Sequence, residues 1–250
     1  MRNIVLTVSY DGTNYCGWQR QKNGPTIQEK LEQAASQVMK EPIAVEGCGR
    51  TDAGVHAMEY ICNFKTGCSI PEDRIALAIN CCLPDDIVVK KAWQTDWDFH
   101  SRFSAKKKTY LYRIDQGPVP NPFQKNYAWY MKYPLDIQKM NKAAADIVGT
   151  HDFRCFMASG GTVKTTVRTV DRLCIEKKGS LVEIEVSANG FLYNMVRIIT
   201  GTLVYVGVGK LQPDCIPGLI AGADRRKAGI TAPPQGLYLK ELVYEGYLGF

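Results

Sequence analysis

The sequence is poor in histidine and has no pair of cysteines at metal-binding spacing. Its three histidines are His56, His100 and His151, and none of its nine cysteines forms a Cys-x-x-Cys pair. Because a structural zinc site needs several such ligands at a recognisable spacing, we expect no metal site. The N-terminus carries no secretory signal pattern, so we expect the cysteines to be free thiols and the protein to be cytoplasmic.

Other signals of common protein classes are also missing. The most membrane-like stretch, residues 191–209, contains Asn194 and Arg197, which favours a buried helix over a membrane span. Residues 207–210 lack the earlier glycine and the following Ser or Thr of a phosphate loop. No Gly-x-Ser-x-Gly motif of a serine hydrolase occurs. The sequence therefore predicts neither a nucleotide-binding protein nor a serine hydrolase.

Positive charge is present in excess and is grouped along the chain. The formal net charge is +6. The largest group consists of Arg102, Lys106, Lys107, Lys108 and Arg113. Smaller groups are Arg225-Arg226-Lys227 and Arg20 with Lys22, and the interleaved aromatic residues are Trp18, Phe103, Tyr110 and Tyr112. Such groups are often only a solvated face, but aromatic rings between cations favour phosphates and stacked bases as ligands.

Hydrophobic periodicity predicts the order β-α-β-β-α-β in the first part of the chain. Residues 4–10 alternate as a strand does, and a capping box at Thr26 opens an amphipathic helix. The further elements are extended segments at 43–46 and 60–65, a helix opened by residues 69–72, and a strand at 87–92. The RNA-recognition module shares this order, which is compatible with an RNA ligand.

The second part of the chain repeats the order. Its expected elements are a strand at 109–115, a helix at 135–148 ended by Gly149, a hairpin of 170–176 and 181–187, a helix from 191 to about 203, and a strand at 237–244. The predicted fold class is α+β, with two ferredoxin-like lobes of mostly antiparallel sheet joined side by side and an active-site cleft between them. We place the lobes at residues 1–104 and 105–250, because charge rises abruptly there.

Residues 47–57, Gly-Cys-Gly-Arg-Thr-Asp-Ala-Gly-Val-His-Ala, combine three glycines with one Arg and one Asp. Glycine permits tight turns and close backbone approach, so the segment predicts a loop that presents Arg50 and Asp52 into a cleft. The alternative is an ordinary hairpin turn, because Asp-Ala-Gly is common in turns. With metal and nucleotide motifs missing, a carboxylate kept charged by a neighbouring Arg is the remaining catalytic chemistry.

Arg197 lies on an otherwise apolar helix. A buried Arg without a partner carries a large desolvation cost, so it needs a carboxylate, and Asp52 is our candidate. The alternative is that Arg197 lies at a helix edge and is solvated. Tyr110 follows the lysines at 106–108 and either faces RNA or belongs to an ordinary strand core.

Taken together, these residues closely resemble the tRNA pseudouridine synthase A family over nearly the whole chain. The matching blocks are residues 10–13 with 17–19, 49–57, 99–103, 110–112, 191–197 and 233–239. Six blocks in order are far more specific than the glycine-rich loop alone. Cys48 replaces a small residue that is usual in the family.

The resemblance implies a cofactor-free isomerase that converts uridine to pseudouridine in the anticodon arm of tRNA, at tRNA positions 38–40. It implies that Asp52 is the nucleophile, Arg197 its partner and Arg50 an aid to base extrusion. It also implies that Tyr110 stacks on the target base and that Leu237 lines the pocket. We expect further substrate contacts from His56, Arg102, Lys106 and Lys107. Members of the family are usually homodimers, so we expect one here.

Two rival functions follow from the same residues. A non-catalytic RNA-binding protein would need the basic groups and aromatic rings but not Asp52. A metal-dependent nuclease would need two or more clustered acids, and the glycine-rich loop contains only Asp52. Within the isomerase hypothesis, both direct attack of Asp52 on C1′ and an elimination route stay open.

Overall fold

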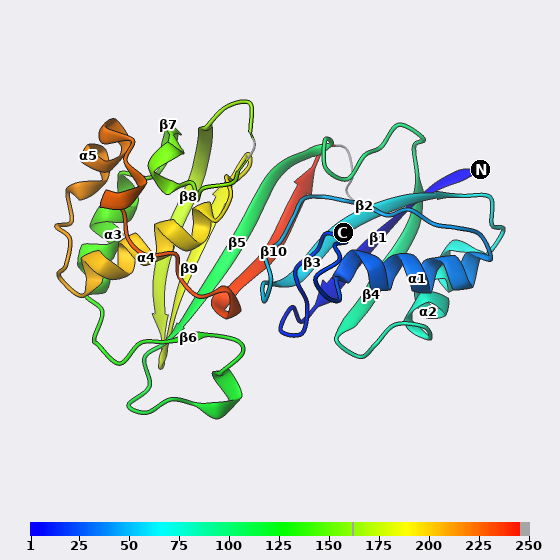
Figure 1. Ribbon diagram of the computed structural model, residues 1–250, viewed down its shortest axis with the longest axis horizontal. Helices are drawn as coiled ribbons and strands as arrows, with labels where there is room; N and C mark the ends of the chain where they lie inside the picture. The colour runs from blue at the N-terminus through cyan, green and yellow to red at the C-terminus, as the bar shows by residue number, and fades with distance from the viewer. Residues whose placement is uncertain (162, 246–250) are drawn as a thin grey trace. The chain divides into compact units, whose positions relative to one another are not determined.

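A computed structural model of the chain describes residues 1–161 and 163–245 (Figure 1). It divides into two compact units: unit 1 comprises Met1–Lys106 and Tyr238–Phe250, and unit 2 comprises Lys107–Leu237. Residues 246–250, which end the second expected lobe, lie outside the described residues. Each unit combines a mostly antiparallel sheet with a few helices, which confirms the α+β class.

Unit 1 follows the predicted order β-α-β-β-α-β and adds a final strand. Its elements are β1 (Arg2–Tyr10), α1 (Ile27–Met39), β2 (Glu46–Gly47), β3 (His56–Thr66), α2 (Glu72–Asn80), β4 (Ile87–Thr95) and β10 (Leu237–Tyr244). The strands lie in the order β4-β1-β3-β10, and the short β2 pairs with β3. β1 is antiparallel to both neighbours, whereas β10 runs parallel to β3. α1 and α2 pack against one another, and α2 packs on β4.

Local chemistry explains where α1 begins and ends. The Thr26 hydroxyl accepts a hydrogen bond from the Glu29 amide at 3.4 Å, as the capping pattern predicts, and Lys40 ends the helix in the left-handed conformation. The buried face of the helix consists of Ile27, Leu31, Ala34, Ala35 and Met39. The apolar stripe that the sequence predicts is therefore the face that packs in the core of unit 1.

β1 is buried on both faces and not only on its more apolar one. Val5 and Thr7, on the second face, are as inaccessible as Ile4 and Leu6 on the first. On the second face, the Asn3 amide group donates to the carbonyl oxygen of Phe99 at 3.0 Å. The segment that follows β4, residues 96–104, is thereby tied to the start of β1.

Unit 2 contains the other strands of the sheet and the remaining helices. Its elements are β5 (Ala105–Asp115, which begins in unit 1), β6 (Trp129–Tyr130), α3 (Ile137–Ala145), β7 (Gly149–Asp152), β8 (Val167–Lys178), β9 (Leu181–Ala188), α4 (Met195–Gly207) and α5 (Cys215–Gly222). Short 3-10 turns occupy Pro122–Gln124, Phe153–Phe156, Arg225–Lys227 and Pro234–Gly236. The strand order is β5-β9-β8-β7, all antiparallel, with β6 parallel to β5.

The final strand differs most from the expected lobes. From Tyr238 onward β10 is grouped with unit 1, where Tyr238 and Leu239 pair with His56 and Ala57. The Tyr244 hydroxyl also donates to the carbonyl oxygen of Ser101 at 2.7 Å. Periodicity identifies a strand but not its partner, because strand pairing is a non-local interaction.

Within the described ranges, every helix is too short or too polar to span a bilayer.

Candidate active site

The loop of residues 47–55, here called the glycine loop, is anchored on both sides of Asp52. The Trp18 amide donates to the Thr51 carbonyl oxygen at 3.1 Å, and the Thr51 hydroxyl lies 2.8 Å from the hydroxyl of Tyr10. Beyond Asp52, the Val55 amide donates to the Asp52 carbonyl oxygen at 3.2 Å. The backbone that carries the carboxylate is therefore held by Tyr10 and Trp18 on one side and by the turn from Asp52 to Val55 on the other.

Two glycines of the segment after β1 allow the glycine loop to pack so closely. A Cβ atom on Gly12 would lie 2.0 Å from the Val55 carbonyl oxygen. Gly17 has φ +91°, and its Cβ would lie 2.4 Å from the Thr51 carbonyl oxygen. Any side chain at these positions would displace the backbone around Asp52. The blocks at residues 10–18 and 49–57 are thus one packed structure, although 30 or more residues separate them in sequence.

A stacked aromatic pair supports the start of the glycine loop. The rings of Trp18 and Tyr60 lie 3.8 Å apart and nearly parallel, and the Tyr60 hydroxyl donates to the Gly49 carbonyl oxygen. Burial raises the pKa of Tyr60 well above its ordinary value, which keeps the hydroxyl protonated and able to donate. From the sequence alone, Tyr60 is indistinguishable from the other residues of the apolar run after the loop. Its role follows only from the fold.

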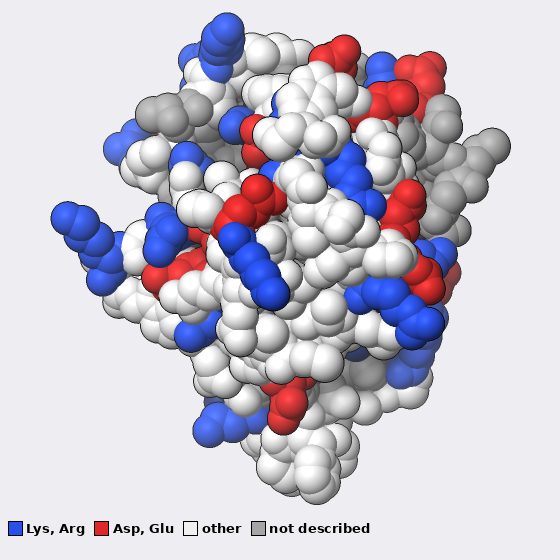
Figure 2. All heavy atoms as spheres, turned by 90° about the vertical axis from the view of Figure 1, so that its right-hand side faces the viewer, with Lys and Arg blue, Asp and Glu red and all other residues white. Residues whose placement is uncertain are grey.

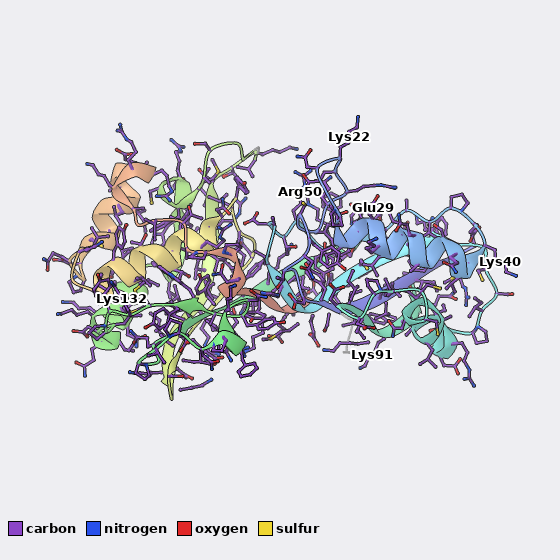
Figure 3. All side chains as sticks on the ribbon, turned by 60° about the horizontal axis from the view of Figure 1, so that its bottom comes forward. Lys22, Glu29, Lys40, Arg50, Lys91 and Lys132 are labelled. Carbon is purple, nitrogen blue, oxygen red and sulfur yellow. The ribbon has the colours of Figure 1, made fainter. Side chains whose placement is uncertain are left out.

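Asp52 and Arg50 differ in exposure. The Asp52 side chain is half-buried, whereas Arg50, labelled in Figure 3, is exposed. Both residues lie within the anchored stretch, so their backbone positions are set by the same contacts. The glycine loop therefore carries a half-buried carboxylate and an exposed guanidinium on an anchored backbone.

His56 corrects one expectation. We expected it to contact the substrate, but its side chain is only 2% exposed and stacks on Tyr238 of β10. Its Nδ1 atom accepts a hydrogen bond from the Gly12 amide at 3.1 Å and lies 3.0 Å from a carboxylate oxygen of Asp11. His56 therefore packs the base of the glycine loop.

Arg197 lies in the first turn of α4 and not in the middle of a helix. α4 begins at Met195, four residues later than the expected start, because Asn194 adopts a left-handed conformation with φ 59°. The half-buried guanidinium donates to the Ala232 carbonyl oxygen at 2.7 Å and to Oδ1 of Asn194 at 2.9 Å. The Ala232 amide in turn donates to the Arg197 carbonyl oxygen at 3.0 Å. Arg197 is therefore held on both sides, and is not simply solvated at a helix edge.

The segment between α5 and β10, residues 223–236, packs directly on α4. A Cβ atom on Gly201 would lie 1.9 Å from the Ile230 carbonyl oxygen, and the Gly229 amide donates to the Thr202 hydroxyl at 2.8 Å. Farther along, the Pro233 carbonyl oxygen accepts a hydrogen bond from Tyr112 at 2.7 Å. Leu237 follows as the first residue of β10 and is 5% exposed. The packing of residues 229–230 on α4, which the sequence did not predict, positions the Ala232 carbonyl oxygen that accepts from Arg197.

Tyr110 lies on β5, opposite Val186 of β9, and is half-buried. Its ring meets the ring of Phe191 edge-on, with 5.1 Å between the centroids and 88° between the planes. The tyrosine and the segment before α4 are therefore in direct contact within unit 2. One side of the Tyr110 ring is packed, as a strand tyrosine usually is, while part of it stays accessible.

The largest basic group is partly neutralised by acids. Lys106 lies 2.9 Å from a carboxylate oxygen of Glu245, and Lys107 lies 3.3 Å from one of Asp171, whereas Arg102 is exposed. Arg225 donates to the Gly229 carbonyl oxygen at 2.8 Å and so has a structural role. On the face drawn in Figure 2, cations and carboxylates are interspersed. On this face the basic residues do not form one unbroken cationic surface.

Over residues 1–161 and 163–245, no three His, Cys, Asp or Glu side chains gather closely enough to hold a metal ion. The described site residues are instead a carboxylate, guanidinium groups and aromatic rings. These groups can act as a nucleophile, as its electrostatic partner and as stacking surfaces.

Comparisons with known proteins agree with the sequence blocks. A family model described as tRNA pseudouridine synthase matches residues 6–104 and 143–245. A protein from Thermoanaerobacter sp. (strain X514) named tRNA pseudouridine synthase A is 51% identical over 98% of this chain and 100% of its own length. A protein of the same name from Ruminiclostridium cellulolyticum is 50% identical, with the same coverage. A crystal structure of a Cbf5-Nop10-Gar1 complex is similar with a TM-score of 0.43 and 12% identity, over 94% of this chain and 48% of that one.

Proposed function

Since this chain belongs to the tRNA pseudouridine synthase family, we infer that it is an isomerase that converts uridine to pseudouridine in tRNA. The observation that carries this inference is the family match over both parts of the chain, which includes the glycine loop with Arg50 and Asp52. The match does not favour the alternative of a non-catalytic RNA-binding protein.

We propose that Asp52 is the nucleophile of this reaction. The bond between C1′ and N1 of the uridine breaks, the uracil turns, and a bond forms between C1′ and C5. The proton lost from C5 balances the proton gained at N1, so the reaction needs neither an oxidant nor a phosphoryl donor. The anchored backbone around Asp52 supports this role, because a nucleophile is effective only when held in position. Both direct attack on C1′ and elimination are compatible with a carboxylate here.

We propose three supporting roles on the basis of the family resemblance. Arg197 pairs with Asp52 and keeps it ionised, and its fixed contacts to Ala232 and Asn194 suit such a role. Arg50 occupies the space that the extruded base leaves, which its exposure permits. Tyr110 stacks on the extruded base, and Leu237 lines the pocket.

The finer identity of the substrate is also part of this proposal. We propose that the target uridines lie in the anticodon arm, that the enzyme acts as a homodimer, and that it works in the cytoplasm, without a cofactor. The resemblance to the tRNA pseudouridine synthase A family supports the first two points. Substrate contacts from Arg102, Lys106 and Lys107 fit an RNA ligand.

An Asp52→Asn variant tests the proposal. It should bind tRNA as tightly as the unchanged protein, since the fold around the loop depends on backbone contacts, yet release tritium from [5-³H]uridine in tRNA at less than about a thousandth of the rate. Asp73→Asn, which removes the charge of an exposed carboxylate on α2, is the matched control and should release tritium normally. Normal turnover by Asp52→Asn would refute the nucleophile. Lack of pseudouridine formation by the unchanged protein would refute the isomerase itself.

A further inference from the structure

An exposed aromatic residue stands on an unusually well-fixed turn after β4. The turn comprises residues 99–104, and Ser101 at its centre is fully buried. The Ser101 amide donates to Oδ1 of Asn63 at 2.9 Å, and its hydroxyl donates to the Glu46 carbonyl oxygen at 2.6 Å. The Ser101 carbonyl oxygen accepts from Tyr244 at 2.7 Å. Every polar group of Ser101 is therefore satisfied by the sheet of unit 1, and the turn is tied to three strands.

A second set of contacts closes the turn on itself. Nδ1 of His100 accepts from the Arg102 amide at 3.1 Å, and the Ser104 amide donates to the His100 carbonyl oxygen at 2.9 Å. Since Nδ1 is an acceptor, the hydrogen of the neutral ring is on Nε2, which faces a carboxylate oxygen of Glu46 at 3.6 Å. The backbone on both sides of Phe103 is thus held without any contribution from the Phe103 side chain.

Phe103 itself is 75% exposed. Its ring centroid lies 4.4 Å from that of His100, and the Arg102 guanidinium carbon lies 5.6 Å from the Phe103 centroid. A single exposed apolar residue is common and by itself indicates nothing. Here, however, the ring is backed by a second aromatic ring, flanked by an exposed guanidinium and carried by a rigid turn. An aromatic ring beside a cation is the combination that binds an unpaired nucleotide, with the base on the ring and the phosphate on the cation.

The turn is also connected to the glycine loop. Glu46, whose carbonyl oxygen holds Ser101, lies on β2, and the chain then continues directly into the loop with Arg50 and Asp52. Both features therefore belong to unit 1 and share one support. A nucleotide bound on the turn would be held at a defined position relative to the nucleophile.

We propose that Phe103 and Arg102 form a binding position for a second nucleotide of the substrate RNA, distinct from the uridine that reacts. Phe103 stacks on an unpaired base and Arg102 contacts the adjacent phosphate. The proposal rests on the proposed function, because it takes RNA as the substrate. It assigns Phe103 the role of a positioning residue that acts on substrate binding and not on the chemical step.

Steady-state kinetics with tRNA test the role of the ring. Phe103→Ala should raise KM about tenfold, with a much smaller effect on kcat, because one stacked base is lost from the bound state. Phe103→Trp should restore KM, while Phe103→Leu, which keeps an apolar side chain without an aromatic face, should not. Restoration by leucine would overturn the stacking proposal, as would an unchanged KM in Phe103→Ala.

A spectroscopic signature and a matched control complete the test. The additional tryptophan of Phe103→Trp should lose fluorescence on addition of tRNA, relative to the unchanged protein, because stacking quenches it. Tyr133 is 57% exposed beside Lys132, whose ammonium lies 4.9 Å from its ring, so it is an aromatic–cation pair without the buried support. Tyr133→Ala should leave KM unchanged, and an equal rise in KM would overturn the assignment to the turn.

A changed oligomeric state of Phe103→Ala with unchanged tRNA affinity would instead assign the ring to a protein interface and overturn the proposal.

The salt dependence of binding tests Arg102 separately. Arg102→Gln should lower the magnitude of the slope of log K against log salt by about 1, as the loss of one phosphate contact requires. An unchanged slope would overturn the phosphate contact. In each of these experiments, the unchanged protein must first form pseudouridine. If it does not, the proposed function fails; if it does and the variants behave like it, only the second nucleotide position fails.

Discussion

At the scale of single residues, the site side chains are fixed by contacts from residues with no recognisable functional signature. Arg197 depends on the Ala232 carbonyl and on Asn194, whose left-handed conformation starts α4 just before the arginine. The sequence showed that Arg197 is out of place on an apolar helix and therefore needs a partner. It could not show these two contacts, because one of them is made by a backbone carbonyl 35 residues away.

Tyr112 provides a test of this indirect support. Burial raises the pKa of its hydroxyl far above the ordinary value, so the group stays protonated and donates to the Pro233 carbonyl oxygen. Tyr112→Phe removes that donor and leaves the carbonyl without it, so the free energy of unfolding should fall by about 1 kcal/mol in a denaturant titration. Tyr193→Phe, at a tyrosine that is 47% exposed, is the control and should change it little. Equal stabilities of the two variants would show that the Tyr112 hydrogen bond contributes nothing.

His56 shows why residue type alone misleads. We expected a substrate contact from His56, yet its ring is packed between the Gly12 amide, Asp11 and Tyr238. Two of these partners come from the segment after β1, and the third comes from the last strand of the chain. Only the tertiary structure brings them together around one ring.

At the scale of elements, local patterns predicted most helices and strands because capping, turns and periodicity are short-range effects. Thr26 caps α1 as its sequence indicates, and β-strands occur at all of the longer predicted strands. The observed start of α4 differs from the predicted one because Asn194 adopts the left-handed conformation directly before it. The extended segment at 43–46 shrank to the two-residue β2, because only Glu46 and Gly47 pair with β3.

The close packing of two loops gives a prediction at this scale. Gly17 and Gly209 both have positive φ, at +91° and +77°, but only Gly17 faces backbone atoms within 4 Å of an added Cβ. Alanine should therefore cost about 1–2 kcal/mol of stability at Gly209, from strain alone. At Gly17 it should cost more, since Thr51 must also move, and tritium release should fall because Asp52 moves with it. The measurements are urea unfolding and tritium release. The same loss of stability at both positions would refute the role of the close contact.

At the scale of the whole molecule, unit 1 is discontinuous in sequence. The chain leaves it after Lys106 and returns at Tyr238, so residues from both ends of the sequence form one sheet. Asp52 belongs to unit 1 and Arg197 to unit 2. The repeated β-α-β-β-α-β order predicts both sets of elements, but it does not show that the last strand is also paired with β3.

Charge is also a property of the whole molecule, and it gives the last prediction. A double variant Lys106→Gln, Lys107→Gln should weaken tRNA binding and lower the magnitude of the salt slope, by at most about 2, because each lysine can neutralise no more than one phosphate. Each lysine already lies beside a carboxylate, Glu245 or Asp171, so the reduction should be smaller than that limit.

The control for this prediction removes the same charge elsewhere. Lys142→Gln, Lys177→Gln alters two other exposed lysines and should leave the salt slope nearly unchanged. Filter binding at several salt concentrations measures both slopes. If both double variants changed the slope equally, the effect would be one of net charge, and the lysines before Tyr110 would not belong to the RNA-binding face.

The sequence by itself determined the α+β class, most of the elements and the identity of the glycine loop, because each follows from short-range pattern or from a resemblance carried by contiguous blocks. Only the tertiary structure decided that β10 pairs with β3, that His56 is buried, and that Lys106 and Lys107 face acids. These outcomes depend on contacts between residues far apart in the chain. Such contacts are set by which surfaces pack together and not by the local preferences of either partner.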